Sequence, residues 1–273
     1  MIHVKRGQAP LVICLPHSGT DIPPVVASRL SANGSLQTDI AWLLPKIFEL
    51  PENLDVTIIS SSISRYVIDV DKSLYPVGEE QASCHALCPL TTYDTKRIYA
   101  QGEEPGAVEI EQRQLLFYKP FYNAVERELA RLRKIYDRIV MLNCSSIQSQ
   151  FRGPHEDEIP LINIETDNGD ACDEALPEII AGSFEQLADY SVSVDKFVTG
   201  GELLRRFAAP GIGVHGASVT VAQRAYLAQE APPFQLDPAK APALTDAMAA
   251  MACNIQGWLS GGLGLSGRAA ADN

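Results

Sequence analysis

His17 is the residue whose type and position most directly indicate chemistry. It follows a run of apolar residues, Leu11–Leu15, within the sequence Pro16-His17-Ser18-Gly19. A continuous apolar run is typical of a buried strand, and the proline and glycine predict a tight turn after it. The imidazole would then lie at the carboxyl end of the strand, where open α/β sheets form their sites. A metal-ligand or acid–base role suits this position, and a hydrogen-bonded structural histidine is the alternative that the motif leaves open.

Charged residues that could complete such a site occur farther along the chain. Asp39 precedes an apolar stretch at residues 40–50, so it is either a site carboxylate or a residue that stabilises the first turn of a helix. Arg65 directly precedes a strand-like segment, residues 66–69, which ends in Asp69. The guanidinium could hold a substrate carboxylate, or it could form an internal ion pair with Asp69.

A second strand pattern ends in small polar side chains. Residues 138–144 repeat the apolar pattern, and Ser145 and Ser146 follow at the expected strand-to-loop junction. A serine hydrolase is only weakly indicated, because the chain has no Gly-x-Ser-x-Gly elbow and no base is identifiable near either serine. Cys144 is a conceivable nucleophile if it contacts His17, but the sequence does not show such a contact.

The elements that must position these residues alternate between strands and helices, which predicts the α/β class. A chain of 273 residues can bury both faces of one sheet, so we expect a single domain over residues 1–260. Residues 261–273 are rich in Gly and Ala and are expected to be a disordered tail. Further strands are predicted at residues 55–60, 161–164, 192–197 and 212–221, and helices at residues 109–136 with a kink at Pro120, 172–187 and 243–259.

Composition limits the partners that the chain can have. The net charge of −12, the pI near 4.9 and the absence of a dense basic stripe disfavour nucleic acid. No apolar stretch approaches the roughly 20 residues that cross a bilayer, which disfavours a membrane partner. The N-terminal residues lack a signal-peptide pattern and the six cysteines are scattered, which favours reduced thiols and a cytoplasmic location. A small anionic substrate is compatible with this charge, since it needs only one or two arginines.

Taken in order, these residues and several further short motifs resemble the N-formylglutamate amidohydrolase (deformylase) family. The resemblance covers residues from about Leu11 to Tyr226, and it is the ordered set rather than any single motif that is specific. The motifs are Pro-His-Ser-Gly at 16–19, Thr-Asp at 38–39, Ser-Arg-Tyr-Val-Ile-Asp at 64–69, Leu-Cys-Pro at 87–89, Thr-Tyr-Asp at 92–94, Tyr-Lys-Pro-Phe at 118–121, Asp-Asn-Gly at 167–169, Gly-Gly at 200–201, Gly-Val-His at 213–215 and Gln-Arg-Ala-Tyr at 223–226.

This resemblance implies a fold, a reaction and a set of site residues. The fold would be a three-layer α/β/α arrangement with a mixed central sheet, similar to zinc carboxypeptidases. The reaction would be metal-assisted hydrolysis of an amide or formamide on an N-acylated acidic amino acid, in which zinc activates water. His17 and Asp39 would occupy two of the metal-ligand positions, while Arg65 and Arg205, with Asp69 beside them, would form the substrate site.

The chain departs from the family at the expected third metal ligand. Members typically end the strand after the long helix in Asp-Ala-His-Ser, which supplies the remaining histidine, whereas this chain has Asn-Cys-Ser-Ser at residues 143–146. A thiolate can bind zinc, so Cys144 could complete a three-ligand site with His17 and Asp39. We expect such a site to bind zinc more weakly than the family's own, or to hold none under ordinary purification.

A second departure affects the expected general base. Thr220 stands where the family usually has a glutamate, and a threonine cannot accept a proton from metal-bound water at neutral pH. His215 is an apparent substitute, but residues 215 and 220 point to opposite faces of an ideal strand. A bulge could redirect His215, and a structural histidine is the alternative. The two departures leave two hypotheses: a divergent hydrolase, and a weak or inactive protein that still binds the small molecule.

Overall fold

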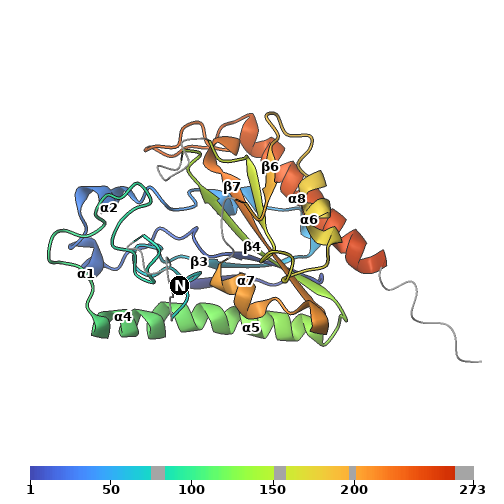
Figure 1. Ribbon diagram of the computed structural model, residues 1–273, viewed down its shortest axis with the longest axis horizontal. Coiled ribbons are helices and arrows are strands. Elements are labelled where there is room, and N and C mark those ends of the chain that lie inside the picture. The colour runs from blue at the N-terminus through green and yellow to red at the C-terminus, as the bar shows by residue number, and fades with distance from the viewer. Residues whose placement is uncertain (75–83, 151–157, 197–200, 262–273) are drawn as a thin grey trace, which may run out of the picture.

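A mixed β-sheet forms the centre of the molecule (Figure 1). The structure, a computed structural model, describes residues 1–74, 84–150, 158–196 and 201–261. Across these residues the sheet has seven strands in the order β1-β3-β2-β4-β7-β5-β6. Neighbours among β3, β2, β4 and β7 are parallel, while β1 and β5 run antiparallel to β3 and β7. The strands are β1 (Ile2–Lys5), β2 (Leu11–Leu15), β3 (Thr57–Ser61), β4 (Ile139–Ile147), β5 (Ile162–Glu165), β6 (Val192–Val194) and β7 (Val214–Ala222).

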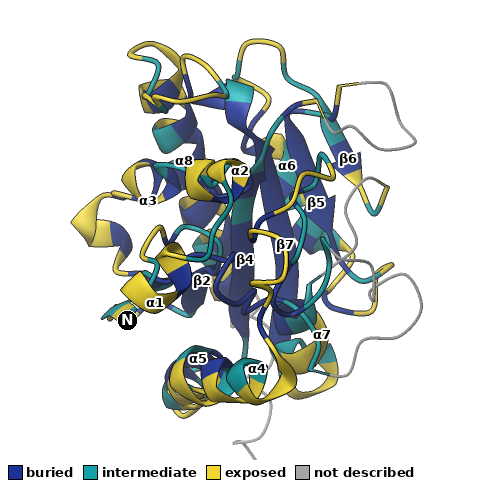
Figure 2. Cartoon of the chain, turned by 90° about the vertical axis from the view of Figure 1, so that its left-hand side faces the viewer, coloured by how far each residue is buried: buried dark blue, intermediate teal, exposed yellow. Residues whose placement is uncertain are grey.

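Helices cover both faces of this sheet. In Figure 1, α4 and α5 run below it, and α6 and α8 lie above it. Figure 2 shows the central strands buried between these layers and the outer surfaces of α4 and α5 exposed. The predicted three-layer α/β arrangement with a mixed sheet is therefore confirmed. The α-helices are α1 (Pro24–Ala27), α2 (Ala32–Leu36), α3 (Leu44–Ile47), α4 (Ala107–Arg113), α5 (Lys119–Arg133), α6 (Ala175–Gly182), α7 (Glu202–Phe207) and α8 (Lys240–Gly261).

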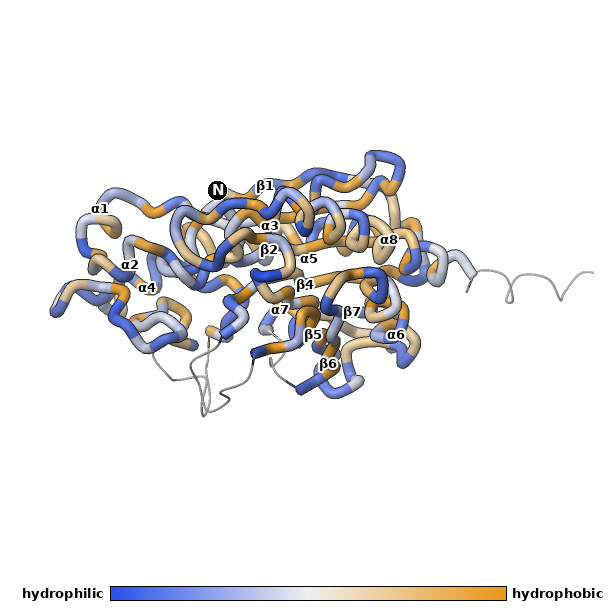
Figure 3. Tube along the Cα trace, turned by 90° about the horizontal axis from the view of Figure 1, so that it is seen from above, coloured by the Kyte–Doolittle hydropathy of each residue, from blue (hydrophilic) through white to orange (hydrophobic). Residues whose placement is uncertain are grey.

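Each face of the sheet has its own apolar cluster, because side chains alternate along a strand. On β4, Ile139 and Met141 pack in the cluster under α5, and Val140, Leu142 and Cys144 pack in the cluster under α3 and α8. Figure 3 shows hydrophobic residues along the central strands and more hydrophilic residues in the outlying loops. The polar residues at the carboxyl end of β4 must therefore belong to one face or the other.

Some sequence predictions need correction. Residues 66–69 are not a strand: residues 65–67 form a turn, in which the Val67 amide donates to the Ser64 carbonyl, and residues 68–69 are irregular. The helix predicted over residues 109–136 is α4, one π-helical segment at Gln114–Tyr118, and α5. Pro120 is the second residue of α5 and directly follows the π-helical segment, inside a helical run that continues from Ala107 to Arg133.

Some of the predicted features fall on residues that the structure does not describe. The tail over residues 262–273, the end of the strand predicted at 192–197, and Gly200 lie outside the described residues. No helix within the described ranges is both long and apolar enough to span a bilayer.

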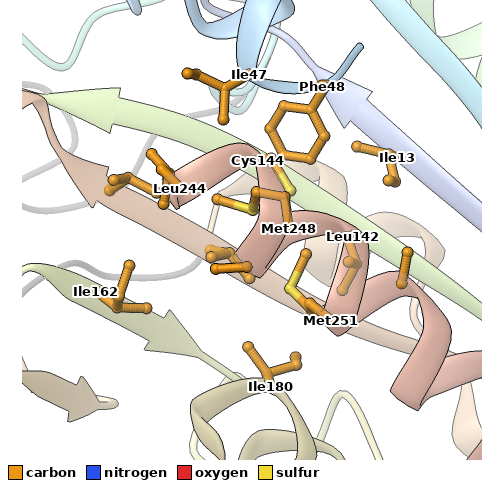
Figure 4. Close-up of a cluster of buried hydrophobic side chains, with 14 of the residues drawn as sticks. Ile13, Ile47, Phe48, Leu142, Cys144, Ile162, Ile180, Leu244, Met248 and Met251 are labelled. Atoms are coloured by element: carbon orange, nitrogen blue, oxygen red, sulfur yellow. The ribbon is translucent and has the colours of Figure 1, made fainter. Parts of the chain in front are cut away.

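The packing of Cys144 yields a first prediction. Its side chain lies among Ile13, Phe48 and Met248 in the apolar cluster (Figure 4). Replacing Cys144 with His would overfill this cluster and bury a polar ring, so we expect a loss of about 2 kcal/mol or more in the free energy of unfolding. Urea denaturation measures the loss. Cys253→His, at an exposed position of α8, is the matched control and should change stability by less than about 0.5 kcal/mol; equal stability of the two variants would contradict this packing.

Candidate active site

The turn after β2 holds His17 at the carboxyl edge of the sheet. The Ala41 amide donates to the His17 carbonyl at 2.9 Å, which fixes the backbone on one side. On the other side Gly19 packs so closely against the chain after β3 that a Cβ there would lie 2.3 Å from the Ser62 carbonyl carbon. Only glycine fits this approach. The sequence motif thus leaves the imidazole at the strand end, with 12% of the side chain exposed.

Both nitrogens of the His17 imidazole are hydrogen bonded to the protein. Nε2 lies 2.7 Å from Asp69 Oδ1, and Nδ1 lies 3.2 Å from Ser145 Oγ. Because an ionised carboxylate can only accept, the hydrogen must be on Nε2, which donates to Asp69. In the neutral imidazole, Nδ1 then keeps its lone pair and can accept from the Ser145 hydroxyl. The three groups form a chain of hydrogen bonds running from hydroxyl through imidazole to carboxylate.

The Asp69 carboxylate is fully buried and has several donors around it. Oδ1 also accepts from the Asp71 amide at 3.0 Å, and Oδ2 lies 3.1 Å from Nε and 3.0 Å from Nη2 of Arg65. Burial raises the pKa of Asp69, but the attraction of His17 and Arg65 outweighs burial and holds the pKa well below its usual range. Asp69 is therefore ionised at neutral pH.

Arg65 is enclosed rather than offered to a ligand. Its side chain is 1% exposed, its guanidinium lies 4.3 Å from the Tyr93 ring centroid, and Nη2 donates to the Cys84 carbonyl. The sequence left two roles open for Arg65, a clamp for a substrate carboxylate and an internal ion pair with Asp69. The structure contains the internal ion pair. On the far side, Nη1 lies 3.7 Å from Asp39 Oδ2.

Asp39 is buried beyond Arg65, and does not begin a helix, since α3 starts at Leu44. Its Oδ2 accepts from the Tyr93 amide at 3.1 Å, and its own amide donates to the Tyr66 hydroxyl at 3.3 Å. Burial raises the pKa of Asp39, and Arg65 lowers it only in part. Each of these contacts joins Asp39 to another part of the protein.

The register between β4 and β7 decides which polar residues face His17. Ser145 pairs with Thr220 and Asn143 with Ser218, and all four share the face of the sheet that carries Met141. Thr220 therefore lies next to Ser145, where it is buried and holds no acidic proton near neutral pH.

Cys144 faces the opposite way. It lies in the apolar cluster under α8, and burial raises the pKa of its thiol well above the usual value. The structure does not bring Cys144 to His17, contrary to the expectation for a third ligand or a nucleophile. Aligning Asp-Ala-His-Ser with residues 143–146 places the family's histidine at Ser145 rather than at Cys144.

His215 lies away from the other candidates. It is at the start of β7, on the face opposite Thr220, and its ring packs edge-on against Trp258 with the centroids 5.3 Å apart. Nδ1 accepts from the Asp173 amide at 3.1 Å. Burial and the nearby Arg138 lower the pKa of His215. Its contacts are those of a structural histidine.

Asp71 and Asn143, to which sequence analysis assigned no role, join α7 to this edge of the sheet. Asp71 Oδ1 accepts from the Leu203 amide at 2.8 Å, and Oδ2 accepts from Asn143 Nδ2 at 2.7 Å. Gly201 is required at the start of α7, because a Cβ would lie 1.9 Å from Asp71 Oδ2. Burial raises the pKa of Asp71. Arg205 is on this helix, with its Nε 3.7 Å from Glu202 and 35% of its side chain exposed.

The residues present do not fit the zinc that the family resemblance implies. Within the described ranges, no group of three or more His, Cys, Asp or Glu residues is arranged to hold a metal ion. Both His17 nitrogens and both Asp69 oxygens already have protein partners, and Cys144 faces the core. The site chemistry therefore has to be derived from the side chains alone.

Comparison with known proteins agrees with the motif analysis. The sequence profile of the N-formylglutamate amidohydrolase family matches residues 9–227. The chain belongs to this family. It is similar to the N-formylglutamate deformylase of Pseudomonas aeruginosa, with 28% identity over 237 residues that cover 85% of this chain and 87% of that protein. The N-formylglutamate deformylase of Pseudomonas putida is 26% identical over 239 residues, covering 86% and 87%.

Solved structures share the fold of this N-formylglutamate amidohydrolase family member. The crystal structure of N-formylglutamate amidohydrolase from Ralstonia eutropha superposes with a TM-score of 0.82 at 16% identity, covering 96% of this chain and 99% of that chain. A gene product of Agrobacterium tumefaciens superposes with a TM-score of 0.67 at 17% identity, covering 96% and 95%. At these identities the likeness establishes the three-layer fold.

The enclosed ion pair generates a second prediction. Arg65→Met leaves Asp69 and Asp39 buried without their cation, so we expect a loss of about 3–5 kcal/mol in the free energy of unfolding. Arg127→Met removes a mostly exposed arginine near Glu128 and should cost less than about 1 kcal/mol.

The pH dependence gives this prediction its sign. Arg65 lowers the pKa of Asp69, so the stability it contributes is present above the unfolded pKa and is lost on acidification. The parent's advantage over Arg65→Met should therefore shrink below about pH 4, because the carboxylates of the variant take up protons first. Denaturation measured from neutral to acid pH checks this, and an advantage that stays constant would contradict the assigned pairing.

Proposed function

We propose that this chain is a hydrolase that cleaves the amide or formamide bond of an N-acylated acidic amino acid. The observation that carries the proposal is the His17 imidazole, oriented by the ionised Asp69 and partly exposed at the carboxyl edge of the sheet. Family membership supports the reaction class, since the curated relatives are named N-formylglutamate deformylases. N-Formylglutamate is accordingly the first substrate to test.

His17 has the chemistry that hydrolysis of an amide requires. Its Nδ1 lone pair can take the proton of the attacking hydroxyl, and the same nitrogen can return that proton to the departing amine. Asp69 stabilises the imidazolium that forms between the two steps. Thr220 can do neither, so the proton route passes through His17 rather than through the position where the family carries glutamate.

Zinc was expected as a cofactor, and its usual contribution is to activate water and polarise the carbonyl. The donor atoms that would bind it are engaged by other protein groups, so the proposed hydrolysis is independent of metal.

Substrate carboxylates need a cation that solvent can reach. Arg65 is enclosed by protein, which leaves Arg205 as the family-matched arginine with an exposed fraction large enough to contact a ligand. It is on α7, the helix that Asp71 attaches to the site edge. We therefore assign recognition of an acidic substrate to Arg205.

A binding protein without turnover is the second candidate. Thr220 favours it, because removing a positioned acid–base group costs roughly 10²- to 10⁴-fold in rate. The two candidates differ in whether formate appears when N-formylglutamate is added.

The third prediction concerns turnover. We expect the parent to release formate from N-formylglutamate, and His17→Gln to lower kcat by at least about 100-fold, because the base is lost. His3→Gln, at an exposed position of β1, should keep the parental rate. A chelator should leave the rate unchanged. Calorimetric binding without formate release would favour the binding protein, and activity that a chelator abolishes and zinc restores would overturn the metal-independent route.

The fourth prediction concerns specificity. Arg205→Ala should raise KM for N-formylglutamate by about 10- to 100-fold with a smaller change in kcat, because a charge-assisted hydrogen bond is lost. The neutral diamide of the same compound should bind parent and variant alike. Arg127→Ala, which removes a mostly exposed arginine of α5 near Glu128, is the control. An equal KM for the acid and the diamide in the parent would remove Arg205 from the substrate site.

A further inference from the structure

We propose that Ser145 is a nucleophile, and that hydrolysis proceeds through an acyl ester on its Oγ. The substrate class in this inference rests on the proposed function, but the reactivity of Ser145 rests on geometry alone. Sequence analysis gave a serine hydrolase little weight because no base was identifiable near this serine. The fold supplies that base from a segment 128 residues earlier in the chain.

The geometry is that of a nucleophile, a base and an orienting acid in series. Ser145 Oγ lies 3.2 Å from His17 Nδ1, and His17 Nε2 lies 2.7 Å from Asp69 Oδ1. These separations are within the hydrogen-bonding reach of such a series. The three residues come from the end of β4, the turn after β2 and the segment after β3, so the carboxyl edge of three adjacent parallel strands assembles them.

The other hydroxyls nearby do not share this arrangement. Ser146 faces the opposite side of β4, where it is buried and lies 2.6 Å from the Tyr226 hydroxyl. Thr220 is beside Ser145 in the register but is buried, whereas Ser145 and His17 are both partly exposed. Ser145 is therefore the hydroxyl that combines a bonded base with access from solvent.

Asp69 is held as an acceptor and does not compete for the proton. The Arg65 guanidinium contacts Oδ2, while His17 and the Asp71 amide share Oδ1. With its negative charge fixed in this way, Asp69 keeps the His17 hydrogen on Nε2 and stabilises the imidazolium once Nδ1 takes a second proton. Arg65 is a positioning residue that acts through Asp69.

The reaction balances without a cofactor. Ser145 Oγ bonds to the acyl carbon as its proton passes to His17 Nδ1. The C–N bond then breaks, the amine takes the proton from Nδ1, and the acyl group stays on Oγ as an ester. Water attacks the ester, gives one proton to Nδ1, and Oγ leaves and regains that proton. The sum is amide plus water giving carboxylic acid plus amine.

The first test uses a fluorophosphonate probe, which forms a stable ester with an activated serine and requires no knowledge of the substrate. Peptide mapping by mass spectrometry should find the adduct on Ser145. Labelling should disappear in Ser145→Ala and in His17→Gln, and persist in Ser146→Ala, which removes the neighbouring hydroxyl on the opposite face. Folding of each variant is checked by circular dichroism. Absence of an adduct on Ser145 in the folded parent overturns the proposal.

The second test uses N-formylglutamate and separates the two proposals. Ser145→Ala should lower kcat by on the order of 10³-fold or more, because nucleophile and base act as a unit. Labelled Ser145 without hydrolysis of any N-acylated acidic amino acid would overturn the proposed function and leave the nucleophile supported. Formate release that survives Ser145→Ala would overturn the nucleophile and leave the function standing. Neither labelling nor turnover would overturn both.

Discussion

The buried carboxylate of Asp69 is the group on which the rest of the site depends. Removing a carboxylate from water is costly unless charge and hydrogen bonds compensate, and Arg65 supplies both from within the protein. Asp69 in turn fixes the orientation and the tautomer of His17. These contacts explain why a fully buried arginine lies close to His17. Arg65 keeps Asp69 ionised, and the cation that we propose for an acidic substrate is Arg205.

The alternation of side chains along β4 decides which residues face the His17 imidazole. Successive residues of a strand point to opposite sides of the sheet, so a shift of one residue exchanges the site for the core. Cys144 packs among apolar side chains, and Ser145 contacts His17. The same alternation sends His215 and Thr220 to different sides of β7, which the sequence did predict. The apolar residues of β4 alternate between the two clusters: Cys144 continues the series of Val140 and Leu142, and Ser145 is on the side of Ile139 and Met141.

Much of the fold followed from apolar runs, because those runs mark the strands and their ends. The position of His17 followed as well, since Pro16 and Gly19 stop the strand in front of it. The contact between His17 and Asp69 did not follow, because it joins segments 52 residues apart through the pairing of β2 with β3. It also requires residues 66–69 to lie outside a strand, whereas their β-branched side chains predicted one. The capping of α7 by Asp71 is another long-range contact that no local pattern encodes.

This molecule has the fold of its family, but the groups around His17 differ from the metal site that the family resemblance implies. The fold and the order of motifs are those of the N-formylglutamate amidohydrolases, while the donor atoms around His17 are committed to protein partners. The central claim is that Asp69 holds the hydrogen of His17 on Nε2 and leaves Nδ1 as a base. Nitrogen-15 NMR of the imidazole at neutral pH measures this directly. We predict a protonated Nε2 and a bare Nδ1, and a hydrogen on Nδ1 with a bare Nε2 would contradict the account.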